Sequence, residues 1–175
     1  YSVVFAQTGL SSDATGTVVT IDGSAKAFGD FPFSKWVDYG GSVSYSYSSI
    51  VSSTISGKQF RLNSATGPSS PISVTGPVTV TGNYVAQYLI TFAQTGLNST
   101  ATGTVVTVNS VTKAYSNLPY SFWVDYGSSI TYSYGSVISS SVADTRFRLN
   151  SVSGLASPIT VTGSVTVTGD YVVQY

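Results

Sequence analysis

Polar and apolar residues alternate over short stretches along most of the chain. Val43, Tyr45 and Tyr47 alternate with serines in one stretch, and Val78 and Val80 alternate with threonines in another. A period of two indicates β-strands with one buried face, whereas an amphipathic helix would show a period near 3.6. The apolar positions hold mainly β-branched and aromatic residues, which favour strands. The pattern therefore predicts an all-β protein.

Glycine-containing turn signals separate these predicted strands. In the first half of the chain they are Asp22-Gly23, Gly40-Gly41, Gly67-Pro68, Gly76-Pro77 and Gly82-Asn83. Such pairs mark turns and loops between strands. Their spacing predicts about seven short strands, which is typical of an immunoglobulin-like β-sandwich. Val, Ile, Leu and Phe side chains, together with Trp36 and Trp123, are expected to form the cores.

The sequence of the first half returns in the second half at a constant offset of 87 residues. Residues 5–10 (FAQTGL) return as 92–97, and residues 36–40 (WVDYG) return as 123–127, without insertion or deletion. We therefore expect two tandem immunoglobulin-like β-sandwich repeats of 87 residues, with domains at residues 1–87 and 88–175. Because tandem repeats rarely end in register by chance, the chain is expected to be part of a longer array.

The boundary between the repeats contains no predicted linker. Tyr84, Ala86, Tyr88, Ile90 and Phe92 keep strict alternation across it, and no Gly or Pro interrupts them. The last strand of the first repeat is expected to run directly into the first strand of the second. This continuity predicts a rigid joint, unlike the flexible joint that a Gly/Ser-rich linker gives.

The composition excludes several classes of function. Charged residues make up 8% of the chain and its net charge is zero, against about 25% charged residues in ordinary soluble domains. The basic residues are spread singly, so no nucleic-acid partner is expected. The chain has no stretch of about 18 apolar residues, so no membrane span is expected. Without His or Cys it lacks common catalytic and zinc-binding groups. We expect no enzyme, no cofactor and no metal site.

Five motifs give the chain a resemblance to a known group of proteins. They are an opening YxVxF at 1–5, GTVVT at 16–20, GSVSYSY at 41–47, FRL at 60–62 and a closing PISVTGPVTVTGNY at 71–84. This pattern resembles the tandem modules of archaeal surface-layer and surface-filament proteins and, more distantly, the internalin-type B repeats of bacterial surface proteins. The resemblance implies an extracellular β-module at the cell surface, with no catalytic residues and no specific ligand.

Together these observations predict a structural segment of an extracellular fibre, filament or surface layer. Its expected partners are copies of itself or further repeats of the same chain. The alternative is an adhesin stalk or a carbohydrate-binding module that binds surface glycans through tyrosines, with Tyr45, Tyr47, Tyr132 and Tyr134 interpreted either as this strip or as core residues. Low charge and the absence of Cys and Met suggest, as a hypothesis, a hot and acidic habitat, because few carboxylates would be lost to protonation.

Two sets of residues suggest an intramolecular isopeptide cross-link between a Lys amine and an Asn carboxamide beside an acid. The first set is Lys26, Asp38 and Asn63, and the second is Lys113, Asp125 and Asn150. The reaction needs an apolar pocket that keeps the amine neutral. The alternative interpretation is a solvated Lys, a turn-forming Asp and a surface Asn, with Asp38–Arg61 and Asp125–Arg148 as surface ion pairs.

One triplet, Asn98-Ser99-Thr100, has the sequence of a glycosylation acceptor and follows the first predicted strand of the second repeat. In the first repeat, Ser11 stands in the position of the asparagine. The triplet predicts a glycan at Asn98 if the protein is secreted.

Overall fold

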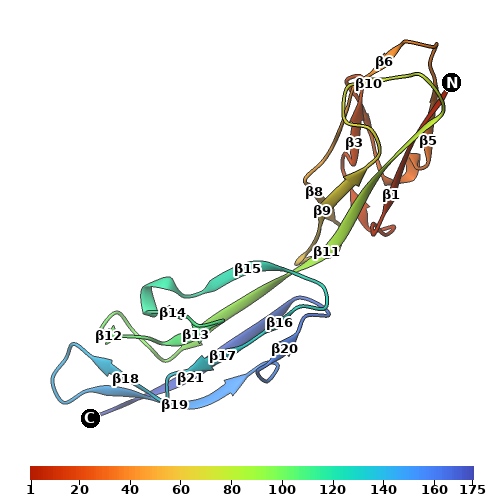
Figure 1. Cartoon of the computed structure of the whole chain (residues 1–175). Coiled ribbons are helices and arrows are strands. Elements are labelled where there is room, and N and C mark those ends of the chain that lie inside the picture. The colour runs from red at the N-terminus through yellow and green to blue at the C-terminus, as the bar shows by residue number, and fades with distance from the viewer. The chain divides into compact units, whose positions relative to one another are not determined.

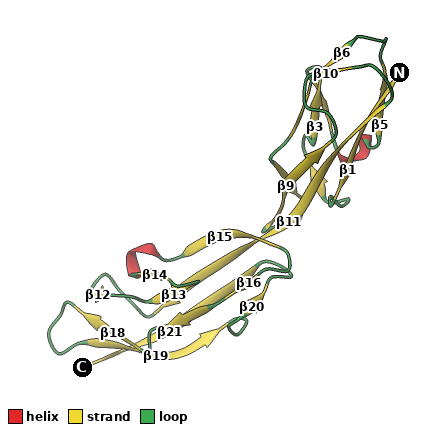
Figure 2. Ribbon diagram, viewed as in Figure 1, coloured by secondary structure: helices red, strands yellow, loops and turns green.

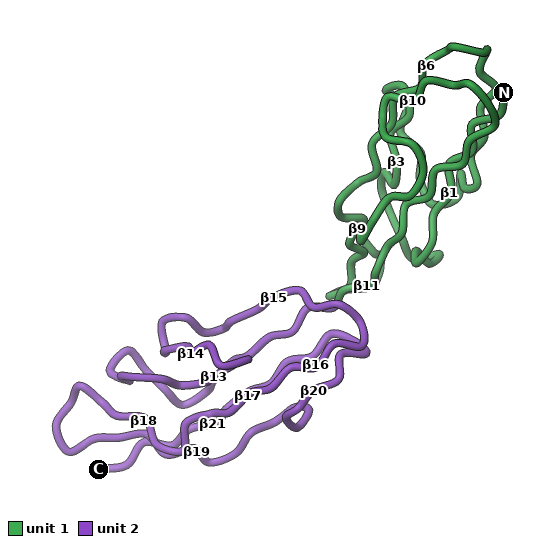
Figure 3. The backbone as a smooth tube through the Cα atoms, in the orientation of Figure 1, with its two compact units in different colours: residues 1–87 green, residues 88–175 purple.

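The structure is a computed structural model that describes all residues, 1–175. It consists of strands and loops with two short 3₁₀ turns, η1 (Phe28–Asp30) and η2 (Tyr115–Asn117) (Figure 2). The all-β prediction is confirmed, and the several sheets are consistent with a β-sandwich. Neither turn has the length or apolar character needed to cross a membrane. The chain divides into two compact units, Tyr1–Gln87 and Tyr88–Tyr175 (Figure 3).

The main sheet of unit 1 has the strand order β5-β1-β11-β9-β8-β2 (Figure 1). A second sheet has the order β4-β3-β7, and β6 pairs with β10. The strands are β1 (Ser2–Thr8), β2 (Ala14–Thr15), β3 (Val19–Ile21), β4 (Ser24–Lys26), β5 (Phe33–Trp36), β6 (Ser42–Val43), β7 (Tyr45–Tyr47), β8 (Ile50–Ser53), β9 (Lys58–Thr66), β10 (Ile72–Ser73) and β11 (Val78–Thr95).

Unit 2 repeats this arrangement, with the main sheet in the order β15-β11-β21-β19-β18-β12. Its smaller sheets are β14-β13-β17 and β16-β20. Strand β11 ends unit 1 with its first part and begins unit 2 with its second part. The remaining strands are β12 (Ala101–Thr102), β13 (Val106–Val108), β14 (Val111–Lys113), β15 (Tyr120–Asp125), β16 (Ser129–Ile130), β17 (Tyr132–Tyr134), β18 (Val137–Ser140), β19 (Arg146–Ser153), β20 (Ile159–Thr160) and β21 (Val165–Gln174).

Each unit has its own apolar core. The largest fully buried side chains are Phe5 and Phe60 in unit 1 and Phe92 and Phe147 in unit 2. Valines and isoleucines from all sheets pack around these rings, as the period-two pattern requires. The cores therefore lie between the main sheet and the smaller sheets of the same unit.

The prediction that Trp36 and Trp123 belong to these cores is wrong. Trp36 is 80% exposed and Trp123 is 39% exposed. The reason lies in the alternation along β5, where Phe33 and Lys35 are half-buried while Ser34 and Trp36 are exposed. Strand β15 shows the same alternation. Both tryptophans are exposed because they lie on the outward face of their strands, although most of the tryptophan side chain is buried in an average protein.

Candidate functional site

The first and last strands of each unit lie side by side in parallel, and we call these pairs the terminal-strand ladders. In unit 1, β1 pairs with β11 in register from Val3↔Val78 to Thr8↔Asn83. In unit 2, β11 pairs with β21 from Ile90↔Val165 to Thr95↔Asp170. Parallel strands need a long connection between them. Almost the whole sequence of each unit therefore lies between the two strands of its ladder.

A buried tyrosine hydroxyl bridges the two strands of each ladder. The Tyr47 hydroxyl lies within hydrogen-bond distance of the carbonyl oxygens of Ala6 on β1, at 2.7 Å, and of Val80 on β11, at 3.1 Å, and its single proton is shared between them. In unit 2, the Tyr134 hydroxyl contacts the corresponding carbonyl oxygens of Ala93 and Val167 at 2.6 and 3.0 Å. One side chain from the smaller sheet thus holds both terminal strands.

A second tyrosine makes the reciprocal connection from the last strand to the opposite side of the unit. The Tyr84 hydroxyl contacts the carbonyl oxygens of Val18 and Ser48 at 3.1 and 3.0 Å. Tyr171 occupies the same position in unit 2 and contacts Val105 and Gly135 at 3.3 and 2.9 Å. Because a buried hydroxyl needs a partner, these bonds fix how the main sheet faces the smaller sheets.

Burial keeps these phenols protonated. It raises the pKa of Tyr47 and of Tyr171 to about 12, and it raises the pKa of Tyr84 and Tyr134 as well. Desolvation disfavours the phenolate form, which explains the direction of all four shifts. The hydroxyls therefore remain hydrogen-bond donors through neutral and moderately alkaline pH.

Side chains also join the last residue pair of each ladder. Thr8 donates to the Asn83 carboxamide oxygen at 2.8 Å, and Thr95 donates to the Asp170 carboxylate at 2.8 Å. Hydrogen bonds from Asn150 and then Thr95 hold the pKa of Asp170 below its usual value. These contacts close the end of the ladder at which the parallel register stops.

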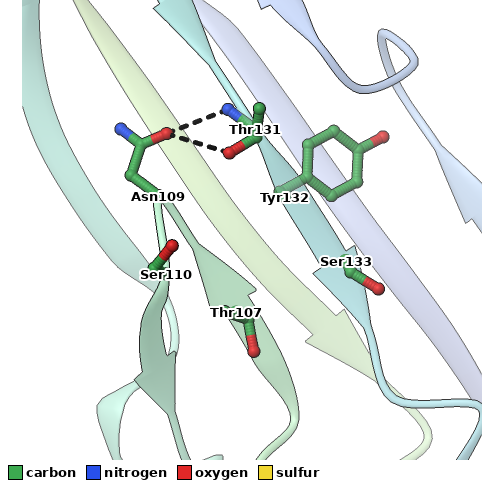
Figure 4. Close-up of a pocket in the computed structure, with 6 residues that line it drawn as sticks. All are labelled: Thr107, Asn109, Ser110, Thr131, Tyr132 and Ser133. Carbon is green, nitrogen blue, oxygen red and sulfur yellow. Dashed lines mark hydrogen bonds between the residues drawn. The ribbon is translucent and has the colours of Figure 1, made fainter.

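One of the hollows on unit 2 is polar and shallow, with a volume of about 200 Å³. Figure 4 shows its lining, in which the Asn109 carboxamide oxygen accepts hydrogen bonds from the backbone and side chain of Thr131, at 2.9 and 3.4 Å. Pockets for small molecules usually measure about 300 to 1,000 Å³. The six lining residues are Thr107, Asn109, Ser110, Thr131, Tyr132 and Ser133. This arrangement offers hydroxyl and amide groups but no adjacent nucleophile and base.

In both predicted isopeptide sets, the Lys and the Asn contact residues other than each other. The Lys26 amine lies 4.2 Å from the centre of the Phe33 ring, and the Lys113 amine lies 3.8 Å from that of Tyr120. Asp38 and Asn63 are exposed, Asp125 is half-buried, and no hydrogen bond joins a Lys to an Asn of either set. Asn63 accepts from Arg61 at 3.5 Å, and Asn150 donates to Asp170 at 3.0 Å. These surroundings are not the apolar pocket that the cross-link needs.

Unit 1 contains two ion pairs that the sequence did not predict. Lys35 contacts Asp22 at 2.6 Å with both side chains well exposed, and Lys58 contacts Asp13 at 2.9 Å with both largely buried. Arg61, predicted to pair with Asp38, donates to the Leu62 carbonyl at 3.3 Å. In unit 2, Arg148 donates to the Leu149 carbonyl at 3.4 Å.

The Lys58–Asp13 pair lies within a small polar cluster. The hydroxyls of Ser11 and Ser53 both donate to the Asp13 carboxylate, and Lys58 also reaches the Ser11 hydroxyl at 3.3 Å. Burial opposes ionisation of Asp13, but the bonds from Ser11, Ser53 and Lys58 outweigh it and hold its pKa well below the usual value. Sequence inspection missed this cluster because Asp13 and Lys58 are far apart in the chain and sit in no recognisable motif.

The predicted tyrosine strip is mostly inside the units. Tyr47 and Tyr134 are buried, which confirms their interpretation as core residues, and Tyr45 and Tyr132 are half-buried. Tyr45 packs against Phe5 with a ring separation of 5.5 Å, and Tyr132 packs against Phe92 at 5.3 Å. The well-exposed aromatic residues are instead Tyr1, Trp36, Tyr39, Trp123, Tyr126 and Tyr175.

No group of three or more His, Cys, Asp or Glu side chains has the arrangement of a metal site. No protein family, curated protein or solved structure matches the chain.

Proposed function

We propose that this chain is a structural, load-bearing segment of an extracellular fibre, filament or surface layer, built from repeated modules. We further propose that each module is an immunoglobulin-like sandwich and that its partners are further repeats or copies of the same chain. The repetition at a constant offset of 87 residues without insertion or deletion, the low charge and the uninterrupted strand β11 support this proposal. The strongest support for a load-bearing role comes from the direction of the terminal-strand ladders.

The ladders are oriented to resist a force applied along the chain. Tyr1 precedes the beginning of β1, and the chain leaves unit 1 beyond the opposite end of the same ladder. A pull on the two ends therefore acts along the paired strands, so that the backbone hydrogen bonds between them must break together. The tyrosine bridges from Tyr47 and Tyr134 add bonds across both strands at the same place.

Single-molecule force measurements test this proposal through the direction of the pull. The chain has no native cysteine, so handles attach only where Cys is introduced. With Tyr1→Cys and Tyr175→Cys, both ladders are loaded along their strands, and we expect two unfolding events at high force. With Tyr1→Cys and Thr75→Cys, both handles lie at one end of the unit 1 ladder, and we expect a clearly lower force because the pairs separate one after another.

The comparison is controlled because the same ladder of unit 1 breaks in both geometries. Forced unfolding reports the unfolding rate under load, so overall stability does not determine the outcome. Equal unfolding forces for the two handle positions would show that the ladder does not provide the resistance, and the load-bearing proposal would be abandoned.

Glycan binding is a second candidate function, supported by an exposed aromatic group in unit 1. Trp36 is 80% exposed, Tyr39 is 73% exposed and Tyr1 is 46% exposed. The Tyr1 and Tyr39 rings are 6.3 Å apart, and Trp36 lies opposite Ser2 in the β1–β5 pairing. Exposed aromatic faces stack on the apolar faces of sugar rings, and such patches often mark interaction sites. This group replaces the tyrosine strip expected from the sequence.

We expect Trp36→Ala to weaken binding to neutral polysaccharides by about tenfold, a loss of roughly 1.4 kcal/mol. Stability should change little because the side chain is mostly exposed. Binding is measured on a glycan array and by sedimentation with insoluble polysaccharides. Wild-type protein that binds no glycan, or a variant that binds as well as wild type, would remove this second candidate.

A further inference from the structure

Asn98 lies on the short loop between the second part of β11 and β12, at the surface of unit 2. Leu97 is buried and fixes the start of the loop, whereas Asn98 and Ser99 are exposed. The chain contains no other Asn-X-Ser/Thr triplet. An enzyme that modifies this triplet therefore has an accessible side chain to reach.

The Asn98 carboxamide uses its oxygen within the protein and leaves its nitrogen available. Its Oδ1 atom accepts from the Thr100 backbone N–H at 2.9 Å and from the Thr100 hydroxyl at 2.7 Å. Its Nδ2 atom makes no hydrogen bond to the protein. Attachment of a sugar to Nδ2 would therefore break no bond of the folded state, and the threonine of the triplet already contacts the acceptor amide.

The equivalent loop of unit 1 has different residues at the positions that matter for modification. Ser11 and Asp13 stand at the positions of Asn98 and Thr100, and Asp13 is held by the largely buried ion pair with Lys58. In unit 2, Thr145 replaces that lysine, and Thr100 instead accepts a hydrogen bond from Ser140 at 3.0 Å. Unit 2 thus has a neutral loop with an outward carboxamide where unit 1 has an internal charge cluster.

We propose that Asn98 is a site of N-linked glycosylation and that unit 1 is not modified at the equivalent place. The inference rests on the proposed extracellular location. The sugar donor is an oligosaccharide linked through pyrophosphate to a membrane lipid. A bond forms between Asn98 Nδ2 and the anomeric carbon while the bond from that carbon to the phosphate oxygen breaks. The lipid pyrophosphate leaves with the electron pair, and one Nδ2 proton passes to a base of the transferase.

The test is translation of the full chain, fused to a secretion signal, with microsomes that contain an oligosaccharyltransferase. Only chain protected from added protease is analysed, so each molecule scored has reached the lumen. We expect one glycan, which an amidase specific for Asn-linked sugars removes while converting Asn98 to Asp. Asn98→Gln and Thr100→Ala should abolish it, whereas Ser99→Ala should retain it.

A transplanted site provides a positive control. Ser11→Asn with Asp13→Thr creates the triplet in unit 1, and Lys58→Thr removes the amine that would lose its partner. This triple variant is expected to carry two glycans. Protected wild-type chain without sugar, or sugar retained in Asn98→Gln, overturns the inference. Neither result affects the proposed structural function, because the force measurements use unmodified protein. Mass analysis of the Asn98 peptide from native material should show the same single modification.

Discussion

Gly9→Ala is expected to prevent stable folding of unit 1 while unit 2 remains folded. A Cβ atom at Gly9 would lie 1.8 Å from the Tyr84 carbonyl oxygen, and the residue has φ +81°. The clash is with backbone, so β11 or the turn after β1 must move. We expect a cost of about 4 kcal/mol or more, which approaches the whole stability of about 5 to 10 kcal/mol for a domain of this size. Amide NMR spectra resolve the two units, and denaturant titration gives the loss.

Gly16→Ala is the matched control for this prediction. Gly16 has φ +82°, but nothing lies within 4 Å of its Cβ position. Only the backbone penalty remains, about 1 to 2 kcal/mol. Gly96→Ala should repeat the large effect in unit 2, because its Cβ would lie 1.8 Å from the Tyr171 carbonyl oxygen. If Gly9→Ala cost no more than Gly16→Ala, the close approach of the turn to the last strand would not exist.

Lys58→Thr is expected to destabilise unit 1 by about 2 to 3 kcal/mol, less than Gly9→Ala but more than the loss of an exposed ion pair. The substitution leaves the Asp13 carboxylate largely buried without its cationic partner, which is the costly way to break such a pair. Asp13→Thr combined with Lys58→Thr gives unit 1 the neutral residues of unit 2 and should recover most of the loss. Urea denaturation at neutral pH measures both variants.

Two comparisons control the ion-pair prediction. Lys35→Ala breaks a pair whose side chains are well exposed, and we expect it to cost about 0 to 1 kcal/mol. Unit 2 has the same sequence in all these variants, so any change in its stability would show an effect that does not come from the ion pair. A single variant as stable as the double variant would show that Lys58 does not support Asp13.

Acid should destabilise unit 1 through the same cluster. The pKa of Asp13 in the folded state lies below its unfolded value of about 3.9. The ionised carboxylate therefore adds stability that is fully present above about pH 5 and is lost as the pH falls toward the lower folded pKa. The Asp13→Thr/Lys58→Thr variant should lose less stability than wild type between pH 5 and pH 2. The hypothesis of an acidic habitat remains a prediction. Asp13 bears on it most directly, because protonation of its carboxylate would remove stability from unit 1.

Local pattern was enough to predict the strand class and several of the strands, but not their number, which exceeds the seven expected for each unit, or their neighbours. The alternation at residues 43–47 and 78–81 marked real strands, and Asp22-Gly23 forms a real turn with positive φ at both residues. The alternation along β5 also places Trp36 on the exposed face with Ser34. Trp36 was predicted to be buried because tryptophan is an apolar residue type. Where the two signals disagree, strand position decides because side chains point alternately to opposite faces.

The candidate site could not be predicted because its parts come from distant segments. Nothing in the local sequence of Tyr47 indicates that its hydroxyl reaches carbonyl groups on both β1 and β11. The Asp13–Lys58 pair likewise depends on how β8 and β9 bring Lys58 back beside the loop after β1. Residue spacing predicts contacts between distant segments only when a known fold shows which strands pair. The contacts of Tyr47, Asp13 and Lys58 all depend on which strands pair.

The parallel ladders also determine when a module can finish folding. Thr8 and its partner Asn83 are 75 residues apart, as are Thr95 and Asp170. During synthesis the first strand of each module must wait, unpaired on that side, until nearly the whole module has emerged from the ribosome. Such distant pairing slows folding. Because the last strands are almost identical, VTVTGN at 78–83 and VTVTGD at 165–170, the waiting first strand also has a wrong partner of nearly the same sequence in the neighbouring module. Exchange of strands between modules is therefore the folding error that we expect of this chain.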